Sequence, residues 1–288
     1  MAILEVKNLT HSYSGNSPFI NDAVKDISFT VNEGEIIGII GHTGSGKSTL
    51  VQHLNGLLKP TEGNVLFKDE DIWSDPTQIR KIRSEVGLVF QYPEYQLFEE
   101  TVYADIAFGP KNMEVEGDEL DKRIRETSRL VGLSDDYLDK SPFDLSGGEK
   151  RRVAIAGVLA MQPRIIIFDE PVAGLDPQGR SMIIDIIRNY REKFNATVII
   201  VSHNMEDMAV LADRLVVMNK GEVALCGKTH EVFSQVEKLQ SIGLNVPMVT
   251  QVFFELKKLG ADVPQDILTV DAAVEYLKGC MKGGAGRA

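Results

Sequence analysis

The segment from Gly41 to Ser48 reads Gly-His-Thr-Gly-Ser-Gly-Lys-Ser and matches the phosphate-loop pattern G-x-x-x-x-G-K-[ST]. Its glycines let backbone N–H groups turn inward around phosphates, Lys47 adds a positive charge, and the Ser48 hydroxyl is placed to bind Mg²⁺. A helix that begins near Gly46 would point the positive end of its dipole at the same anion. The pattern predicts these nucleotide-binding residues: Gly41, Thr43, Gly44, Ser45, Gly46, Lys47, Ser48 and Thr49. His42 lies in the loop at a position that the pattern leaves variable.

Two carboxylates, Asp169 and Glu170, directly follow the apolar run Ile165–Phe168. A buried strand of this kind delivers such groups to the carboxyl edge of a sheet, where nucleotides bind. Asp169 would hold Mg²⁺ directly or through water, and Glu170 would polarise the attacking water. Taken alone, the pair could be a solvated acidic turn after a strand; the phosphate loop in the same chain favours the catalytic interpretation.

A second phosphate-binding geometry is predicted at Leu145-Ser146-Gly147-Gly148-Glu149, which precedes a helix with apolar positions. The Ser146 hydroxyl and the bare N–H groups of Gly147 and Gly148 would face an anion at the N-terminus of that helix. One chain thus carries two geometries suited to a γ-phosphate, although a fold with one phosphate loop needs only one.

The elements that must position these residues follow an α/β pattern. An Ile-rich run at Glu35–Ile40 predicts a strand buried on both faces, followed by the glycine-rich turn and a helix over Ser48–Leu58. Two more buried strands, Arg164–Phe168 and Thr197–Val201, flank a helix at Ser181–Phe194 and form a second βαβ unit.

The remaining segments predict a smaller set of elements. Alternation predicts strands at Ile3–Leu9 and Ile27–Val31, with a loop at Ser14–Pro18 between them. Residues 79–131 are interpreted as mainly helical. A hairpin is expected from Leu215–Met218 and Glu222–Leu225 through Asn-Lys-Gly.

Composition bounds the class of protein. The 288 residues carry 31 Lys and Arg against 42 Asp and Glu, a net charge of −11, with 43% hydrophobic and 25% charged residues. These values are typical of a soluble globular chain, and the acidic balance argues against nucleic-acid binding. Two cysteines form no disulfide framework and indicate reduced thiols in a cytosolic protein. No signal peptide and no membrane span are expected, so a membrane role would come through a partner.

Together these motifs resemble those of the ATP-binding-cassette (ABC) ATPases over about residues 2–235. The resemblance implies an α/β P-loop ABC ATPase with a RecA-like core, an antiparallel β subdomain and a helical signature subdomain. In that family two cassettes form a head-to-tail dimer, so Ser146, Gly147 and Gly148 would contact ATP bound to the other subunit.

The same resemblance assigns four further residues. Tyr13 would stack on adenine; Gln91 would touch Mg²⁺ or water and link to the transport partner. Asp176 matches the D-loop, and His203 the switch histidine that faces the γ-phosphate. Taken alone, Tyr13 would be a loop aromatic, Gln91 a surface polar group and His203 a strand-end histidine. The implied catalytic residues are Glu170, His203, Lys47 and Gln91, and the implied metal ligands are Ser48, Gln91 and Asp169.

A narrower resemblance lies in Tyr92–Val102, Ala107–Asn112 and Arg151–Gly157, which look like the ATPases of energy-coupling factor (ECF) transporters, including the cobalt-importer type. There, two ATPases sit beneath an integral scaffold subunit at the cytoplasmic face of the membrane, and small membrane proteins capture vitamins or metal ions. The aromatic stretch after Gln91 would line the groove for a scaffold coupling helix; alternatively its side chains pack within the helical subdomain. The pattern looks more like the second ATPase type of heterodimeric modules, although a homodimer also occurs.

The expected domains are a nucleotide-binding domain over 1–238, with a helical subdomain at about 92–162, a C-terminal helical extension over 239–280, and a disordered tail over 281–288. The extension resembles one that stabilises the ATPase dimer. Its stripe of Val249, Val252, Phe253 and Leu256 could pack on a partner or on this chain's own core.

The function expected from the sequence is an ATP-hydrolysing subunit, with ATP and Mg²⁺, of an ECF-type importer for a vitamin or transition-metal ion. Its partners would be a second ABC ATPase, a membrane scaffold and a substrate-capture subunit, with no nucleic acid. The alternatives are an ATPase of another ABC transporter class, a soluble cassette acting on nucleic acid or ribosomes, and a module that binds ATP without hydrolysis.

Overall fold

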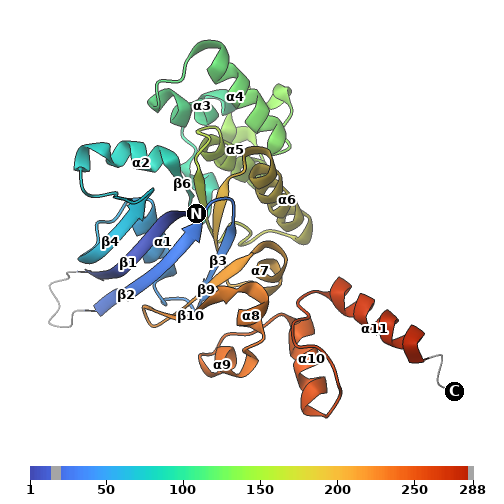
Figure 1. Ribbon diagram of the computed structural model, residues 1–288. Helices are drawn as coiled ribbons and strands as arrows, with labels where there is room; N and C mark the ends of the chain where they lie inside the picture. The colour runs from blue at the N-terminus through green and yellow to red at the C-terminus, as the bar shows by residue number, and fades with distance from the viewer. Residues whose placement is uncertain (14–20, 285–288) are drawn as a thin grey trace.

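The computed structural model describes residues 1–13 and 21–284 and contains two β-sheets with helices around them (Figure 1). The loop expected at Ser14–Pro18 lies outside the described residues. The larger sheet has six strands in the order β10 (Glu222–Lys228), β9 (Arg214–Asn219), β3 (Ile36–Gly41), β8 (Thr197–Val201), β7 (Ile165–Asp169) and β6 (Val86–Val89). All neighbours are parallel except the β9–β10 hairpin. The expected hairpin and the expected βαβ unit, β7–α6–β8, are confirmed. The strand, glycine-rich turn and helix expected after Glu35 are also present, although the next strand, β4, belongs to the smaller sheet.

The parallel sheet is buried on both faces, which explains its continuous apolar runs. Along β3, Ile36 and Ile40 pack into one core cluster while Ile37 and Ile39 pack into the other, because side chains alternate along a strand. One face is covered by α5 (Gly147–Leu159), α6 (Pro177–Phe194) and α7 (Met205–Leu211). The other is covered by α1 (Lys47–Leu54) and the smaller sheet.

The smaller sheet is antiparallel, in the order β2 (Asn21–Asn32), β1 (Ala2–Tyr13), β4 (Glu62–Phe67) and β5 (Glu70–Asp71). Both strands expected near the N-terminus are present and longer than predicted. β4 pairs with β1 and so belongs to the antiparallel β subdomain. The sequence pattern did not predict a strand at these residues.

The middle of the chain is mainly helical, as expected, with one correction. It contains α2 (Ile79–Glu85), the 3₁₀ turn Pro93–Gln96, α3 (Val102–Asn112) and α4 (Gly117–Leu130), and α3 to α5 gather at one end of the molecule (Figure 1). Val86–Val89 is a strand, not part of a helix. All four of its residues are buried, and it pairs with β7 as the edge of the parallel sheet.

The C-terminal part consists of α8 (Thr229–Phe233), α9 (Val236–Ser241), α10 (Met248–Lys258) and α11 (Val270–Gly284). The expected boundary at 238/239 falls inside α9, whose Leu239 is buried in the main core. The expected stripe on α10 divides: Phe253 is buried, whereas Val252 is exposed. α11 extends away from the body (Figure 1) and runs to Gly284, so residues 281–284 are helical rather than disordered. Residues 285–288 lie outside the described part.

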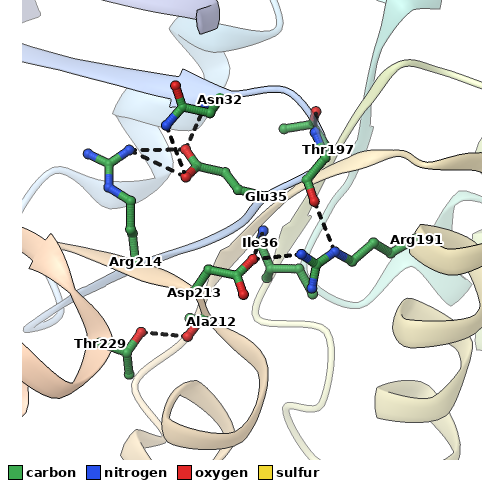
Figure 2. Close-up of polar contacts among 10 residues, drawn as sticks. Asn32, Glu35, Ile36, Arg191, Thr197, Ala212, Asp213, Arg214 and Thr229 are labelled. Atoms are coloured by element: carbon green, nitrogen blue, oxygen red, sulfur yellow. Dashed lines mark hydrogen bonds and ion pairs between the residues drawn. The ribbon is translucent and has the colours of Figure 1, made fainter. Parts of the chain in front are cut away.

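A polar network joins the amino ends of β3, β8 and β9 (Figure 2). The Asp213 carboxylate accepts from the Ile36 backbone N–H and from Arg191, at 2.8 Å each. Glu35 accepts from Arg214 at 3.1 Å. These charged groups lie at the sheet edge opposite to the phosphate loop, so they fix the ends of the strands and are not part of the candidate site.

Within residues 1–13 and 21–284, no helix combines the length and apolar character that crossing a bilayer requires.

Candidate active site

Four loops meet at the carboxyl edge of the parallel sheet because β3, β8, β7 and β6 are successive neighbours. The phosphate loop follows β3, and His203 follows β8. β7 ends at Asp169 and is followed by Glu170. Gln91 follows β6. Residues as far apart in the sequence as Gly41 and His203 are thereby brought to one edge, as expected for a nucleotide site on such a sheet.

The phosphate loop depends on glycine for close packing. Gly46 has φ +99° and precedes α1, and a Cβ there would collide with the carbonyl oxygen of Ala23. The loop is also held from inside by its own backbone, since Ser45 N–H donates to the His42 carbonyl at 3.1 Å. Thr43 and Gly44 are exposed, and Ser45 is buried. The loop therefore presents its outer residues to a ligand while its base is fixed between β2 and β3.

Lys47 lies at the base of this loop. Its Nζ donates to the carbonyls of Gly41 and His42, at 2.7 Å each. Burial lowers the pKa of Lys47, and the negative charges of Glu170 and Asp169 oppose that shift. The three charged groups of the predicted site therefore do lie close to one another.

Asp169 is buried, with 7% of its surface exposed. Burial raises its pKa, while a hydrogen bond with Ser48 and the charge of Lys47 lower it. A carboxylate beside a hydroxyl offers the hard oxygen ligands that Mg²⁺ prefers, so Ser48 and Asp169 fit this ion. Gln91 is exposed and makes no hydrogen bond to either residue within the described part of the chain.

Glu170 and His203 form a direct pair that the sequence did not reveal. His203 Nδ1 lies 2.8 Å from Glu170 Oε2, and the two side chains are 74% and 13% exposed. Glu170 adopts φ +50° and its backbone N–H donates to the Val201 carbonyl at 2.9 Å. The neighbouring strands β7 and β8 thus hold the predicted base and the switch histidine against each other.

Tyr13 stands beside the phosphate loop. Its hydroxyl lies 3.3 Å from Thr49 Oγ1, and half of its surface is exposed. The Tyr13 ring stands edge-on to the His11 ring, with ring centroids 4.8 Å apart. The ring centroids of His11 and His53 are 4.6 Å apart. An exposed aromatic face next to the loop suits a stacked base.

His53 predicts a pH dependence of stability. It is fully buried, and burial lowers its pKa from 6.5 to about 4, although its hydrogen bond to Leu58 opposes the shift. Between these values the unfolded chain binds a proton that the folded chain does not, so stability is full above about pH 6.5 and declines toward pH 4. Between pH 7 and pH 5 we expect a loss of about 2 kcal/mol from this group. Urea unfolding at both pH values measures it, and His53→Gln should remove most of that difference. An unchanged difference would show that other groups cause the pH dependence.

The signature residues begin α5. Ser146 caps the helix: its Oγ donates to the Glu149 carboxylate at 2.6 Å, and its side chain accepts from the Glu149 N–H. Hydrogen bonds from Ser146 and Tyr137 lower the pKa of Glu149 to about 2. Gly147 and Gly148 have helical backbones, and a Cβ at either would meet nothing within 4 Å. Nothing described inside this chain requires glycine there.

Asp176 caps α6 by accepting from the Gly179 N–H at 2.7 Å, and it lines a depression of about 240 Å³ together with Ser146 and Gly148. The D-loop and signature residues therefore share one surface. Among the described residues, no hydrogen bond or ion pair joins residues 146–149 to the phosphate loop.

A groove of about 960 Å³ lies between α2, α3 and α5. Of the aromatic stretch after Gln91, Leu97 and Phe98 line it, and Phe98 packs edge-on against Phe108, with centroids 4.9 Å apart. Tyr92 and Tyr95 do not line it. The other wall carries Arg80, Lys81 and Arg83 of α2. The sequence did not reveal these residues, because α2 carries no recognisable motif.

The comparisons with known proteins agree with this geometry. Residues 24–173 match the family model described as ABC transporter. The chain is 50% identical over 280 residues to the energy-coupling factor transporter ATP-binding protein EcfA2 of Caldanaerobacter subterraneus subsp. tengcongensis, covering 97% of this chain and 98% of that one. It is also 50% identical to the EcfA2 of Clostridium tetani, covering 95% and 96%.

Solved structures show the same likeness. CbiO1 from Clostridium perfringens, part of the ABC transporter complex cbiONQ, superposes with a TM-score of 0.74 at 39% identity, covering 87% of this chain and 98% of that one. A dimeric ATP-binding cassette in a post-hydrolysis state with ADP and Pi superposes with a TM-score of 0.71 at 31% identity, covering 78% and 98%.

The fold is that of an ATP-binding cassette, and the chain is an ATPase. The chain belongs to the ABC transporter family, among the ATP-binding proteins of energy-coupling factor transporters.

Proposed function

We propose that this chain is the ATP-hydrolysing subunit of an ECF-type importer. It works at the cytoplasmic face of the cell membrane and drives uptake of a vitamin or transition-metal ion through a separate membrane scaffold. The observation that carries the proposal is the apolar groove with Phe98 and Phe108, which lies beyond Gln91 and suits an amphipathic helix of a partner. Relatives that match nearly the whole chain carry the corresponding name.

In this mechanism adenine stacks on Tyr13 and the phosphates lie on Gly44–Thr49. Ser48, Asp169 and Gln91 would hold Mg²⁺, which would neutralise charge on the phosphate oxygens. Glu170 accepts a hydrogen bond from water and orients it, and its contact with His203 fixes the carboxylate. Lys47 and His203 stabilise the charge that develops on the γ-phosphate.

A second ABC ATPase completes each site. Gly147 and Gly148 are open to the outside although alanine would favour the helix, so an external group has to approach the backbone there. We assign that group to the γ-phosphate bound by the partner cassette. A heterodimer is favoured over a homodimer, and the exposed Val252, Val274 and Leu277 of the extension supply apolar surface for holding it.

Movement reaches the groove through the segment after Gln91. Asp105 on the wall of the groove accepts from the backbone N–H groups of Phe98 and Glu99, at 3.3 Å each, and burial raises the pKa of Asp105. This contact joins the segment to α3. Closing and reopening of the two cassettes then shift the groove and the helix bound in it.

Affinity purification from detergent-solubilised membranes tests the proposal. The wild-type chain should retain a second ATPase, a scaffold and a small membrane subunit. Phe98→Glu should lower scaffold recovery by about tenfold or more, because the substitution puts a charge on the apolar wall that Phe98 forms with Phe108. Tyr95→Glu is the matched control: Tyr95 is 86% exposed and does not line the groove, so recovery should stay at the wild-type level. Equal recovery with both variants would refute the groove assignment. Ribosomal or nucleic-acid partners instead of membrane subunits would favour the soluble-cassette alternative.

A further inference from the structure

The phosphate loop touches the start of the C-terminal extension. His42 Nε2 lies 2.5 Å from the carbonyl oxygen of Ile242, and because a carbonyl only accepts, the imidazole donates. Gly243 lies against the same ring, since a Cβ there would be 3.1 Å from His42 Cε1 and Nε2. His42 occupies the position that the phosphate-loop pattern leaves free, so the motif itself does not account for this contact.

A second contact joins the same segment to α7, the helix that follows His203. Glu206, three residues after His203 and in the first turn of α7, accepts from the Met248 N–H at 3.3 Å. Between the two contacts, Leu244 and Val246 are buried in the main core. Residues 242–248, here called the connecting segment, are therefore fixed between the phosphate loop and α7, and they lead directly into α10.

The backbone of His42 is also joined to the catalytic lysine. Its carbonyl accepts from Lys47 Nζ at 2.7 Å, and Lys47 is the group that reaches the phosphates of a bound nucleotide. A nucleotide that draws Lys47 away changes the hydrogen bonding of the residue that holds Ile242. The path from phosphate to connecting segment contains only His42 and Lys47.

We propose that His42 and Glu206 are positioning residues that couple nucleotide occupancy to the placement of α10 and α11 through the connecting segment. The consequence for the partner ATPase rests on the proposed function, in which the extension helps to hold the dimer. Coupling of this kind is reciprocal: if ATP shifts the segment, the segment alters the affinity for ATP by the same factor.

Hydrogen exchange tests the first direction in the full-length Glu170→Gln chain, with and without MgATP. ATP should change the exchange of amides in the connecting segment and α10 by about fivefold. His42→Ala should abolish this response, and His42→Gln, whose amide can still donate to Ile242, should retain most of it. If His42→Ala loosens the segment equally with and without ATP, or leaves the response intact, the coupling is refuted and His42 is only structural.

ATP affinity tests the reverse direction at a site that carries no phosphate contact. Met248 is the first residue of α10, where proline is tolerated, so Met248→Pro removes the N–H to Glu206 without breaking the helix. We expect the KM for ATP of the assembled complex to rise about fivefold with little change in kcat. Met248→Ala keeps the N–H and should keep the wild-type KM. An unchanged KM in Met248→Pro refutes the inference. A wild-type complex that neither binds nor hydrolyses ATP would refute the proposed function instead.

Discussion

Replacing Glu170 with Gln is expected to leave ATP binding near the wild-type level and to lower turnover by about a hundredfold or more. Gln has the same shape, so the contact with His203 Nδ1, at 2.8 Å in the native protein, can persist. The amide cannot take a proton from water and carries no negative charge. Loss of that charge also removes one of the two negative charges that raise the pKa of Lys47; the charge of Asp169 remains.

Phosphate release by the purified complex and ATP binding by equilibrium titration measure the two effects separately. Glu192→Gln on the exposed face of α6 is the control for removal of one carboxylate charge and should keep wild-type turnover. Turnover near wild type in the Glu170→Gln complex would exclude Glu170 as the group that orients water. A parallel loss of binding would instead assign it to holding the nucleotide.

Much of the edge of the sheet could be predicted because local patterns encode it. Ile36–Ile40 and Ile165–Phe168 are continuous apolar runs, which are typical of a strand buried on both faces. A phosphate loop and two carboxylates directly follow those runs. Whether the phosphate loop and the carboxylates lie close together depends on the order of the strands in the sheet. The structure gives that order as β3–β8–β7.

Contacts between distant segments could not be read from the sequence in the same way. Glu170 and His203 meet only because β7 and β8 are neighbours, and nothing at either position signals the other. The wall of the groove formed by Arg80 and Arg83 depends on where α2 lies relative to α3 and α5, and no local pattern encodes that position. Val86–Val89 is too short to separate strand from helix by periodicity, so its pairing with β7 settles it.

The C-terminal part illustrates the same limit. The 3.6-residue period found the apolar stripe of α10, but not which members are buried. Phe253 is buried while Val252 remains exposed, because Phe253 faces Tyr276 of α11, at a centroid distance of 5.7 Å. The change of composition near residue 240 suggested a boundary, whereas Leu239, Leu244 and Val246 continue the main core. The hydrophobic core therefore continues past the boundary near residue 240 that the composition suggested.

Gly148→Ala is expected to separate stability from activity. In α5 an added Cβ meets nothing within 4 Å, and alanine favours a helix, so the free energy of unfolding of the isolated chain should stay the same or rise by up to about 1 kcal/mol. Gly279→Ala, also in a helix with an open Cβ, gives the size of that gain where no phosphate is expected. Turnover of the assembled complex should fall about tenfold or more, because a methyl group displaces the partner's γ-phosphate from the helix N-terminus.

ATP binding by the isolated chain decides between action on its own nucleotide and action on the partner's. The phosphate loop of this chain makes no hydrogen bond or ion pair with residues 146–149 in the described structure, so Gly148→Ala should leave its affinity for ATP unchanged while the complex loses turnover. If affinity and turnover fell together, Gly148 would act within its own subunit. If neither fell, no phosphate would approach this helix, and the exposed glycines of α5 would need another cause. Unchanged affinity with lost turnover requires the signature of one subunit to close the nucleotide site of the other, since no single chain then contains all the groups that act on the γ-phosphate.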